Sequence, residues 1–202
     1  MEPLAARIIQ SPLAHDPGRA AACLDAIDPS LRQGSAGALL SGAAGSSPYL
    51  ARLIGRHQDW LPGIMNSDPD WSFASLIDEA QKSVAAAETF AEVGAILRHT
   101  KVRCALLAAL ADLGGVWSLD HVTAALTTLA DSAVEAAAKW LLRAEVAQGR
   151  LPDPMDADAG AGYMIIAMGK WGAGEPNYSS DIDLIALFDD SAFGRDDVLD
   201  AR

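Results

Sequence analysis

Two carboxylates stand two residues apart, just before a short apolar segment near the end of the chain. Asp181 and Asp183 flank Ile182, and the run Leu184 to Phe188 follows. Because residues two apart point to the same face of a strand, this spacing places both carboxylates side by side at the end of a buried strand. Like charges so close repel each other unless a cation is present. Magnesium fits, since it takes a few carboxylates with phosphate oxygens and water, and two such ions can stabilise an in-line phosphoryl displacement.

A glycine-rich loop precedes this pair. The predicted buried strand Tyr163 to Met168 runs into Gly169 and Lys170, and ten residues separate Lys170 from the first carboxylate. Glycine lets a backbone approach a phosphate closely, backbone amides in such a turn can bind it, and lysine adds a positive charge. Ser179 and Ser180 can donate further hydrogen bonds. These residue types predict a site for a nucleotide or a phosphate.

The loop does not match the commonest nucleotide-binding and calcium-binding motifs. Lys170 has no Ser or Thr after it and lacks the upstream glycine spacing of a Walker A loop. The glycines run in the reverse spacing of the dinucleotide fingerprint, and we expect no helix within 169–180. Leu184 and Ile185 stand where an EF-hand needs polar ligands. Taken alone, the Asp-x-Asp pair also fits two acidic residues in a turn before a strand.

Upstream of this loop, the first 150 residues or so predict one helix after another. Apolar residues recur at helical spacing between turn signals. The expected helices are 17–27, 49–60, 71–86, 88–113 and 118–148. The Gly-, Ala- and Ser-rich segment 34–47 is interpreted as a loop or a weak helix. Gly114 and Gly115 form a short turn, so we expect the last two helices to pack as an antiparallel pair.

A basic patch lies on the 88–113 helix. It consists of Arg98, Lys101 and Arg103. Exposed helical charges usually lie on a solvated face and add little to stability, so a solvated face is our first interpretation. Contact with a phosphate or an acidic partner is the alternative.

The composition limits the classes of protein to which the chain can belong. Its 202 residues carry 15 Lys and Arg against 27 Asp and Glu, a net charge of −12, which argues against binding a nucleic-acid backbone. Cys23 and Cys104 are too few for a disulfide framework or a zinc site, and we expect both to be buried. We find neither a signal peptide nor a stretch of about 20 apolar residues, so we expect a cytoplasmic protein with no membrane partner.

The helical pattern changes after Gly149. The segment Leu151-Pro152-Asp153-Pro154 cannot easily continue a helix, and two short apolar runs follow it. We therefore predict an α+β chain, with a helical region at 1–158 and the first strands of a second domain at 159–202.

Gly169 to Ile185 is similar, over seventeen positions, to the signature of the bifunctional glutamine synthetase adenylyltransferase/adenylyl-removing enzymes. The strand, the spacer and the Asp-x-Asp pair also resemble the wider nucleotidyltransferase superfamily of DNA polymerase β. The helical stretch Leu97 to Leu142 looks like the region ahead of the family's first catalytic domain. Trp171, Ala173 and Pro176 depart from the residues expected at their positions.

The resemblance implies an enzyme that regulates nitrogen assimilation through a tyrosine of glutamine synthetase. Its N-terminal half would remove AMP by phosphorolysis, and the full enzyme would attach AMP from ATP. Asp181 and Asp183 would be the catalytic metal ligands for Mg²⁺. The residues implied in nucleotide or phosphate binding are Gly169, Lys170, Ser179 and Ser180. The implied partners are glutamine synthetase and a nitrogen-signalling regulatory protein, with ATP or ADP and phosphate as substrates.

The family's sheet needs further strands, one of which carries a third carboxylate. The acidic residues after the second expected strand, at 189, 190, 196 and 197, are poor candidates for that role. We therefore expect a truncated nucleotidyltransferase sheet and a fragment that is inactive alone. Two other functions stay open: a non-catalytic helical module that docks onto glutamine synthetase, and a nucleotidyltransferase with another acceptor.

Overall fold

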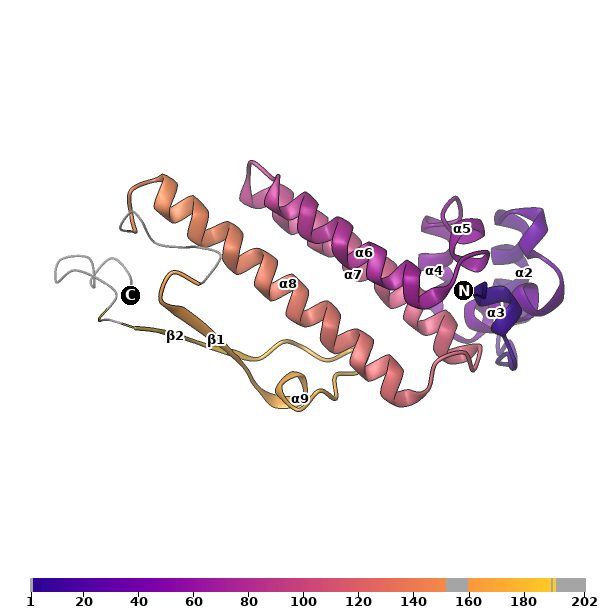
Figure 1. Ribbon diagram of the computed structural model, residues 1–202. Coiled ribbons are helices and arrows are strands. Elements are labelled where there is room, and N and C mark those ends of the chain that lie inside the picture. Colours follow the sequence, from indigo (N-terminus) through magenta and orange to yellow (C-terminus); the bar gives the residue numbers. More distant parts are fainter. Residues whose placement is uncertain (1, 152–159, 190, 192–202) are drawn as a thin grey trace. The chain divides into compact units, whose positions relative to one another are not determined.

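The computed structural model describes residues 2–151, 160–189 and 191 (Figure 1). Helices occupy most of the described chain up to Ala147, and a two-stranded antiparallel sheet follows. The predicted α+β class is therefore confirmed. Among the described helices, none is both long enough and apolar enough to cross a bilayer.

The chain divides into two compact units, each built from separate stretches of sequence. The first unit takes Met1–Asp78 and His99–Leu126, and the second takes Glu79–Arg98 and Thr127–Arg202. The chain passes between the units inside helices of the described part. These are α6 (Pro69–Ala85), α7 (Phe90–Leu113) and α8 (Leu119–Ala147). The predicted boundary near residue 158 falls at positions outside the described residues and stays a prediction.

Short helices form the rest of the first unit. They are α1 (Leu4–Arg7), α2 (Pro17–Ala26), the 3₁₀ turn η1 (Pro29–Leu31), α3 (Gly34–Ser46), α4 (Pro48–Arg56) and α5 (Leu61–Met65). Side-chain oxygens cap two of them, since Asp16 accepts from the Arg19 N–H and Ser47 accepts from the Leu50 N–H. Proline at the first helical position suits both starts, because its missing N–H would lack a partner there anyway.

Helix α3 (Gly34–Ser46) is regular and largely buried, so for 34–47 the loop interpretation was wrong and the helix alternative is confirmed. The reason lies in tertiary packing. A Cβ atom built on Gly42 would lie 1.9 Å from the carbonyl oxygen of Pro12, so only glycine lets the N-terminal segment cross α3 here. The Ser46 hydroxyl donates to the Leu13 carbonyl at 2.7 Å across the same contact. Small residues that look like loop composition therefore serve close packing.

Helix α7 supplies the centre of the first unit's core. Its fully buried residues include Cys104, Leu106, Leu107 and Leu110. These residues lie on more than one side of the helix, so α7 is surrounded here rather than packed along a single stripe. Cys23 is also buried, which confirms the expected burial of both cysteines.

The two longest helices begin where local signals predict. Thr89 and Glu92 form a capping box: the Thr89 hydroxyl accepts from the Glu92 N–H, while the Glu92 carboxylate accepts from the Thr89 N–H. Ser118 caps α8 by accepting from the His121 N–H. The first residue of α7, Phe90, contacts Trp140 in the last third of α8, as expected for antiparallel neighbours.

The sheet of the second unit pairs β1 (Tyr163–Ala167) with β2 (Leu184–Phe188), side by side in Figure 1. The register joins Tyr163 to Phe188 and Ala167 to Leu184. The strand positions agree with the sequence, but the expected burial was wrong. Four apolar side chains on one face, Met164, Ile166, Ile185 and Leu187, are 38% to 61% exposed. No described element covers that face, so apolar composition did not produce burial here.

Candidate functional site

The carboxylate of Asp183 lies against the backbone of Gly169. The Met168 N–H donates to the Asp183 carbonyl at 2.9 Å, which continues the strand pairing one step beyond β1. Gly169 follows with φ at +58°, and a Cβ atom built there would lie 3.1 Å from Asp183 Oδ2. Glycine adopts this left-handed backbone conformation without steric cost, and its missing side chain leaves room for the nearby carboxylate. The structure thus brings together two of the residues predicted from the sequence.

A single helical turn, α9 (Gly169–Gly172), follows this contact. The expectation that 169–180 contains no helix was therefore wrong. The N–H groups of residues 172–175 donate to carbonyl oxygens of residues 168–171, so these amides are used within the turn. Of the amides expected to bind a phosphate, those of Gly169, Lys170 and Trp171 remain as candidates.

Lys170, near the start of the segment 169–180, and Asp181, directly after its end, are both exposed. Neither side chain forms an ion pair within the described part of the chain. Asp181 precedes β2 and shares the exposed segment 181–183 with Asp183. Both groups are thus open to solvent and to a charged ligand.

Asn177 organises the two serines of the loop, and sequence reasoning did not single it out as functional. Its Oδ1 atom accepts from the Ser179 N–H at 3.0 Å and from the Ser179 and Ser180 hydroxyls at 3.1 Å. The Asn177 N–H in turn donates to Ser180 Oγ. Asparagine often makes such local turns, so its position two residues before Ser179 was the available signal. The serines' role toward a nucleotide stays a prediction.

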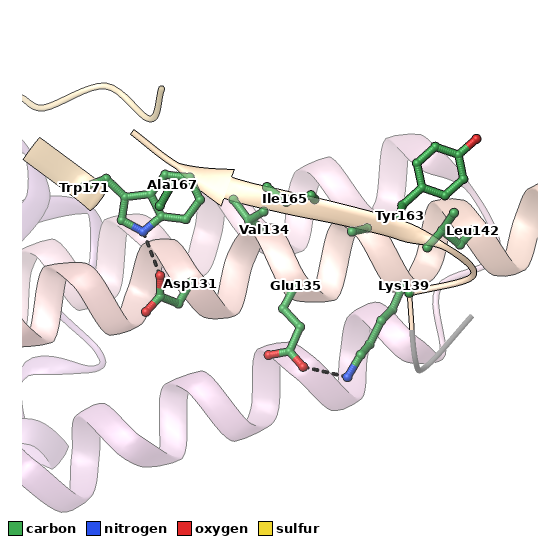
Figure 2. A pocket seen from close by; sticks show the side chains of 11 residues that line it. Asp131, Val134, Glu135, Lys139, Leu142, Tyr163, Ile165, Ala167 and Trp171 are labelled. Atoms are coloured by element: carbon green, nitrogen blue, oxygen red, sulfur yellow. Dashed lines mark hydrogen bonds and ion pairs between the residues drawn. The ribbon is translucent and has the colours of Figure 1, made fainter. Parts of the chain in front are cut away.

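Trp171 anchors the loop to α8. The residue is 5% exposed, and its indole Nε1 donates to Asp131 Oδ1 at 2.7 Å, as Figure 2 shows. Trp171 departs from the expected family residue, and the structure shows what this side chain does in the present loop. A large aromatic residue in an otherwise glycine-rich loop is the signal that points to such an anchor.

A cleft of about 410 Å³ lies between α8 and β1 (Figure 2). Val134, Leu142 and Ile165 supply part of its apolar lining, and an ion pair of 2.6 Å joins Glu135 to Lys139 at its edge. Because strand residues alternate between faces, the β1 side chains in this cleft point away from the face that carries Asp183. The cleft is therefore separate from the carboxylate site.

The residues at the carboxylate site suit magnesium. Two aspartates offer oxygen ligands, and the close approach at Gly169 leaves no side chain between the loop backbone and Asp183. Magnesium commonly takes one or two carboxylates and completes its shell with water and phosphate oxygens. Among the described residues, no three His, Cys, Asp or Glu side chains lie close enough to hold an ion by themselves. A metal here would thus need ligands beyond this pair.

The chain matches the model of a known protein family over a range that includes this loop. The model of the glutamate-ammonia ligase adenylyltransferase family matches residues 38–200. The chain belongs to this family. The match includes the strands, the glycine-rich loop and most of the helical region, and it confirms the family resemblance found in the sequence.

Curated relatives carry the family's longer name. "Bifunctional glutamine synthetase adenylyltransferase/adenylyl-removing enzymes" of Bradyrhizobium diazoefficiens and Rhodopseudomonas palustris (strain BisB5) are 49% and 48% identical to the chain. Each match covers 76% of the chain and 16% of the relative. The relative from Caulobacter vibrioides is 44% identical over 71% of the chain and 15% of its own length. The chain thus spans about a sixth of these relatives, and no solved structure matches it.

Proposed function

We propose that this chain contributes the helical region and the first strands of a nucleotidyltransferase domain that acts on glutamine synthetase. The finer form of the proposal is adenylyl removal from a tyrosine by phosphorolysis, with attachment from ATP by a full-length enzyme. The observation that carries it is the placement of Asp183 against Gly169, in a loop that also presents Lys170 and Asp181. The curated relatives' names give the acceptor protein.

In this proposal the residues of the loop have the following roles. Asp181 and Asp183 supply carboxylate oxygens for Mg²⁺, which when bound would neutralise phosphate oxygens and polarise the phosphoryl group. Lys170, exposed and free of described ion pairs, provides a positive charge for a phosphate oxygen. Gly169 lets the nucleotide approach the backbone beside Asp183. Trp171 keeps this turn in place through its hydrogen bond to Asp131.

Nucleotide binding tests this proposal most directly. We expect ATP and ADP to bind the chain in a magnesium-dependent way, measured by calorimetry. Asp181→Asn and Asp183→Asn should each weaken binding at least tenfold, about 1.4 kcal/mol. Asp25→Asn, which removes a charge that is also exposed but lies in the first unit, should bind as the unchanged chain does. Equal binding by all variants would overturn the site assignment.

Binding to glutamine synthetase separates the catalytic function from a docking module. We expect adenylylated glutamine synthetase to bind the chain and magnesium-nucleotide to change that affinity. An affinity that no nucleotide alters would favour the docking module instead. Because the described residues bring only two carboxylates to the site, we expect ligand binding by this chain without turnover. A role for a nitrogen-signalling regulatory protein, and a cytoplasmic location, stay predictions.

A further inference from the structure

The first unit holds a cluster of two histidines, an arginine and a tryptophan, separate from the glycine-rich loop. His57 directly follows α4 as its C-cap, and Trp60 lies in the turn that leads to α5. His99 and Arg103 are four residues apart on α7, so they lie on one face of that helix. The His57 ring centroid is 5.9 Å from that of His99 and 6.3 Å from that of Trp60. The Arg103 guanidinium stacks over the Trp60 ring at 5.2 Å.

Two polar atoms of this cluster are buried without a partner. His57 Nε2 and Arg103 Nε have no hydrogen-bond partner among the described residues. His57 is only 9% exposed, and Arg103 is half-buried. Proteins pair the great majority of their buried polar groups, because an unpaired one loses its hydration without compensation. The solvated face expected for the basic patch therefore holds for Arg98 and Lys101, which are exposed, but not for Arg103.

The charges around His57 are positive. Burial is the main cause that lowers the pKa of His57, and the positive charges of Arg103, His99 and Arg56 lower it further. Neither His57 nor Arg103 forms an ion pair with a carboxylate in the described part of the chain.

We propose that this cluster binds a small oxyanion, a phosphate or carboxylate group, between Arg103 and His57. The Arg103 Nε–H would donate to one oxygen, and His57 Nε2 would donate to another when it carries a proton. Trp60 holds the guanidinium plane in place by stacking. The cluster borders solvent at His99, which is exposed, and at Trp60, which is half-buried. His57 Nε2 and Arg103 Nε are themselves covered, so an ion reaches them when a neighbouring side chain moves. The site belongs to the first unit and does not depend on the proposed adenylyl chemistry.

The test follows the histidine ring protons by NMR while sodium phosphate, or separately sodium acetate, replaces chloride at constant ionic strength. We expect saturable shifts for His57 and His99 and a rise in the pKa of His57 at saturation, since a bound anion favours the charged ring. The two salts tell a phosphate site from a carboxylate site. Shifts that stay linear with both salts would overturn the proposal.

Variants locate the site. Arg103→Gln should bind at least tenfold more weakly, whereas Lys101→Gln, which removes an exposed charge from the same helix, should bind normally. If Arg103→Gln does not fold, Arg103→Lys takes its place, because it keeps the charge and loses the planar Nε donor. Equal affinity for the Arg103 and Lys101 variants would also overturn the proposal.

Discussion

The indole N–H of Trp171 donates to the carboxylate of Asp131 at 2.7 Å, although forty residues separate the two in sequence. Trp171 belongs to α9, and Asp131 belongs to α8. Since Trp171 comes two residues after Gly169, this hydrogen bond and the burial of the indole hold the start of the loop against the helix. The position of the candidate nucleotide site therefore depends on a contact outside the Asp-x-Asp segment.

Replacing Trp171 by Phe tests that contact. The variant keeps an aromatic ring but removes the N–H donor, so Asp131 loses its partner. We expect the free energy of unfolding, measured in urea, to fall by about 1–3 kcal/mol. Trp71→Phe, at a position that is 55% exposed, is the matched control and should change stability by less than about 0.5 kcal/mol. Equal losses for the two variants would show that the hydrogen bond does not hold the loop.

Alanine variants at two glycines of the same loop distinguish the effect of backbone strain from the effect of contact with the Asp183 carboxylate. Both Gly169 and Gly174 have positive φ, but only at Gly169 would a Cβ atom meet Asp183. Alanine at either position should cost about 1–2 kcal/mol of unfolding free energy. Gly169→Ala should also weaken magnesium-nucleotide binding at least tenfold, whereas Gly174→Ala should not. Comparable binding losses in both variants would mean that the contact at Asp183 is irrelevant to binding.

The Asn177 turn predicts a local effect on hydrogen exchange. Asn177→Ala removes the acceptor that holds the Ser179 N–H and both serine hydroxyls. We expect the Ser179 amide to exchange about tenfold faster, as the loss of one hydrogen bond of about 1.4 kcal/mol would give. Asn177→Asp keeps an acceptor oxygen and should exchange slowly. An Asp variant as fast as the Ala variant would contradict the role of Oδ1.

The buried thiol of Cys104 predicts a loss of stability in alkali. Burial raises the pKa of Cys104 to about 12, whereas a thiol in the unfolded chain ionises near pH 8.5. Between these values the unfolded state releases a proton that the folded state keeps, so unfolding becomes easier as the pH rises. The slope from this thiol is at most about 1.4 kcal/mol per pH unit. We expect the free energy of urea unfolding of the unchanged chain to fall relative to that of Cys104→Ala between about pH 8 and 10, because the variant has no thiol to ionise. A difference between the two that does not change with pH would contradict the raised pKa of Cys104.

The long helices could be predicted because their signals are local. The capping box at Thr89 and Glu92 and the cap at Ser118 lie within a few residues of the helices that they start. For 34–47 the composition allowed both a loop and a helix, because Gly42 and Gly45 serve close contacts with Pro12 and Ala14, which lie outside the segment. Strand positions followed from apolar runs, but burial depends on what packs on the sheet, and composition alone does not contain that information.

In the candidate site, too, contacts that depend on nearby sequence could be predicted and those that depend on distant residues could not. Gly169 and Asp183 could be predicted as neighbours, since a strand, a loop and a second strand bring the two ends of the loop together. The partner of Trp171 could not be predicted, because nothing near Asp131 in the sequence marks it as an acceptor for a residue so far away. The helical turn at Gly169 was missed because it is only four residues long and rich in glycine.

The division into two units has a practical consequence for any attempt to dissect the chain. The passages between units, at 78–79, 98–99 and 126–127, all lie inside helices of the described part. No single cut in a connecting loop can release a complete unit, and a fragment ending at residue 78 would lack the α7 residues Leu106, Leu107 and Leu110 that fill its core. Shortened versions that stop inside this region should therefore aggregate or be degraded by proteases, and a failed truncation would reveal interrupted folding rather than a missing function.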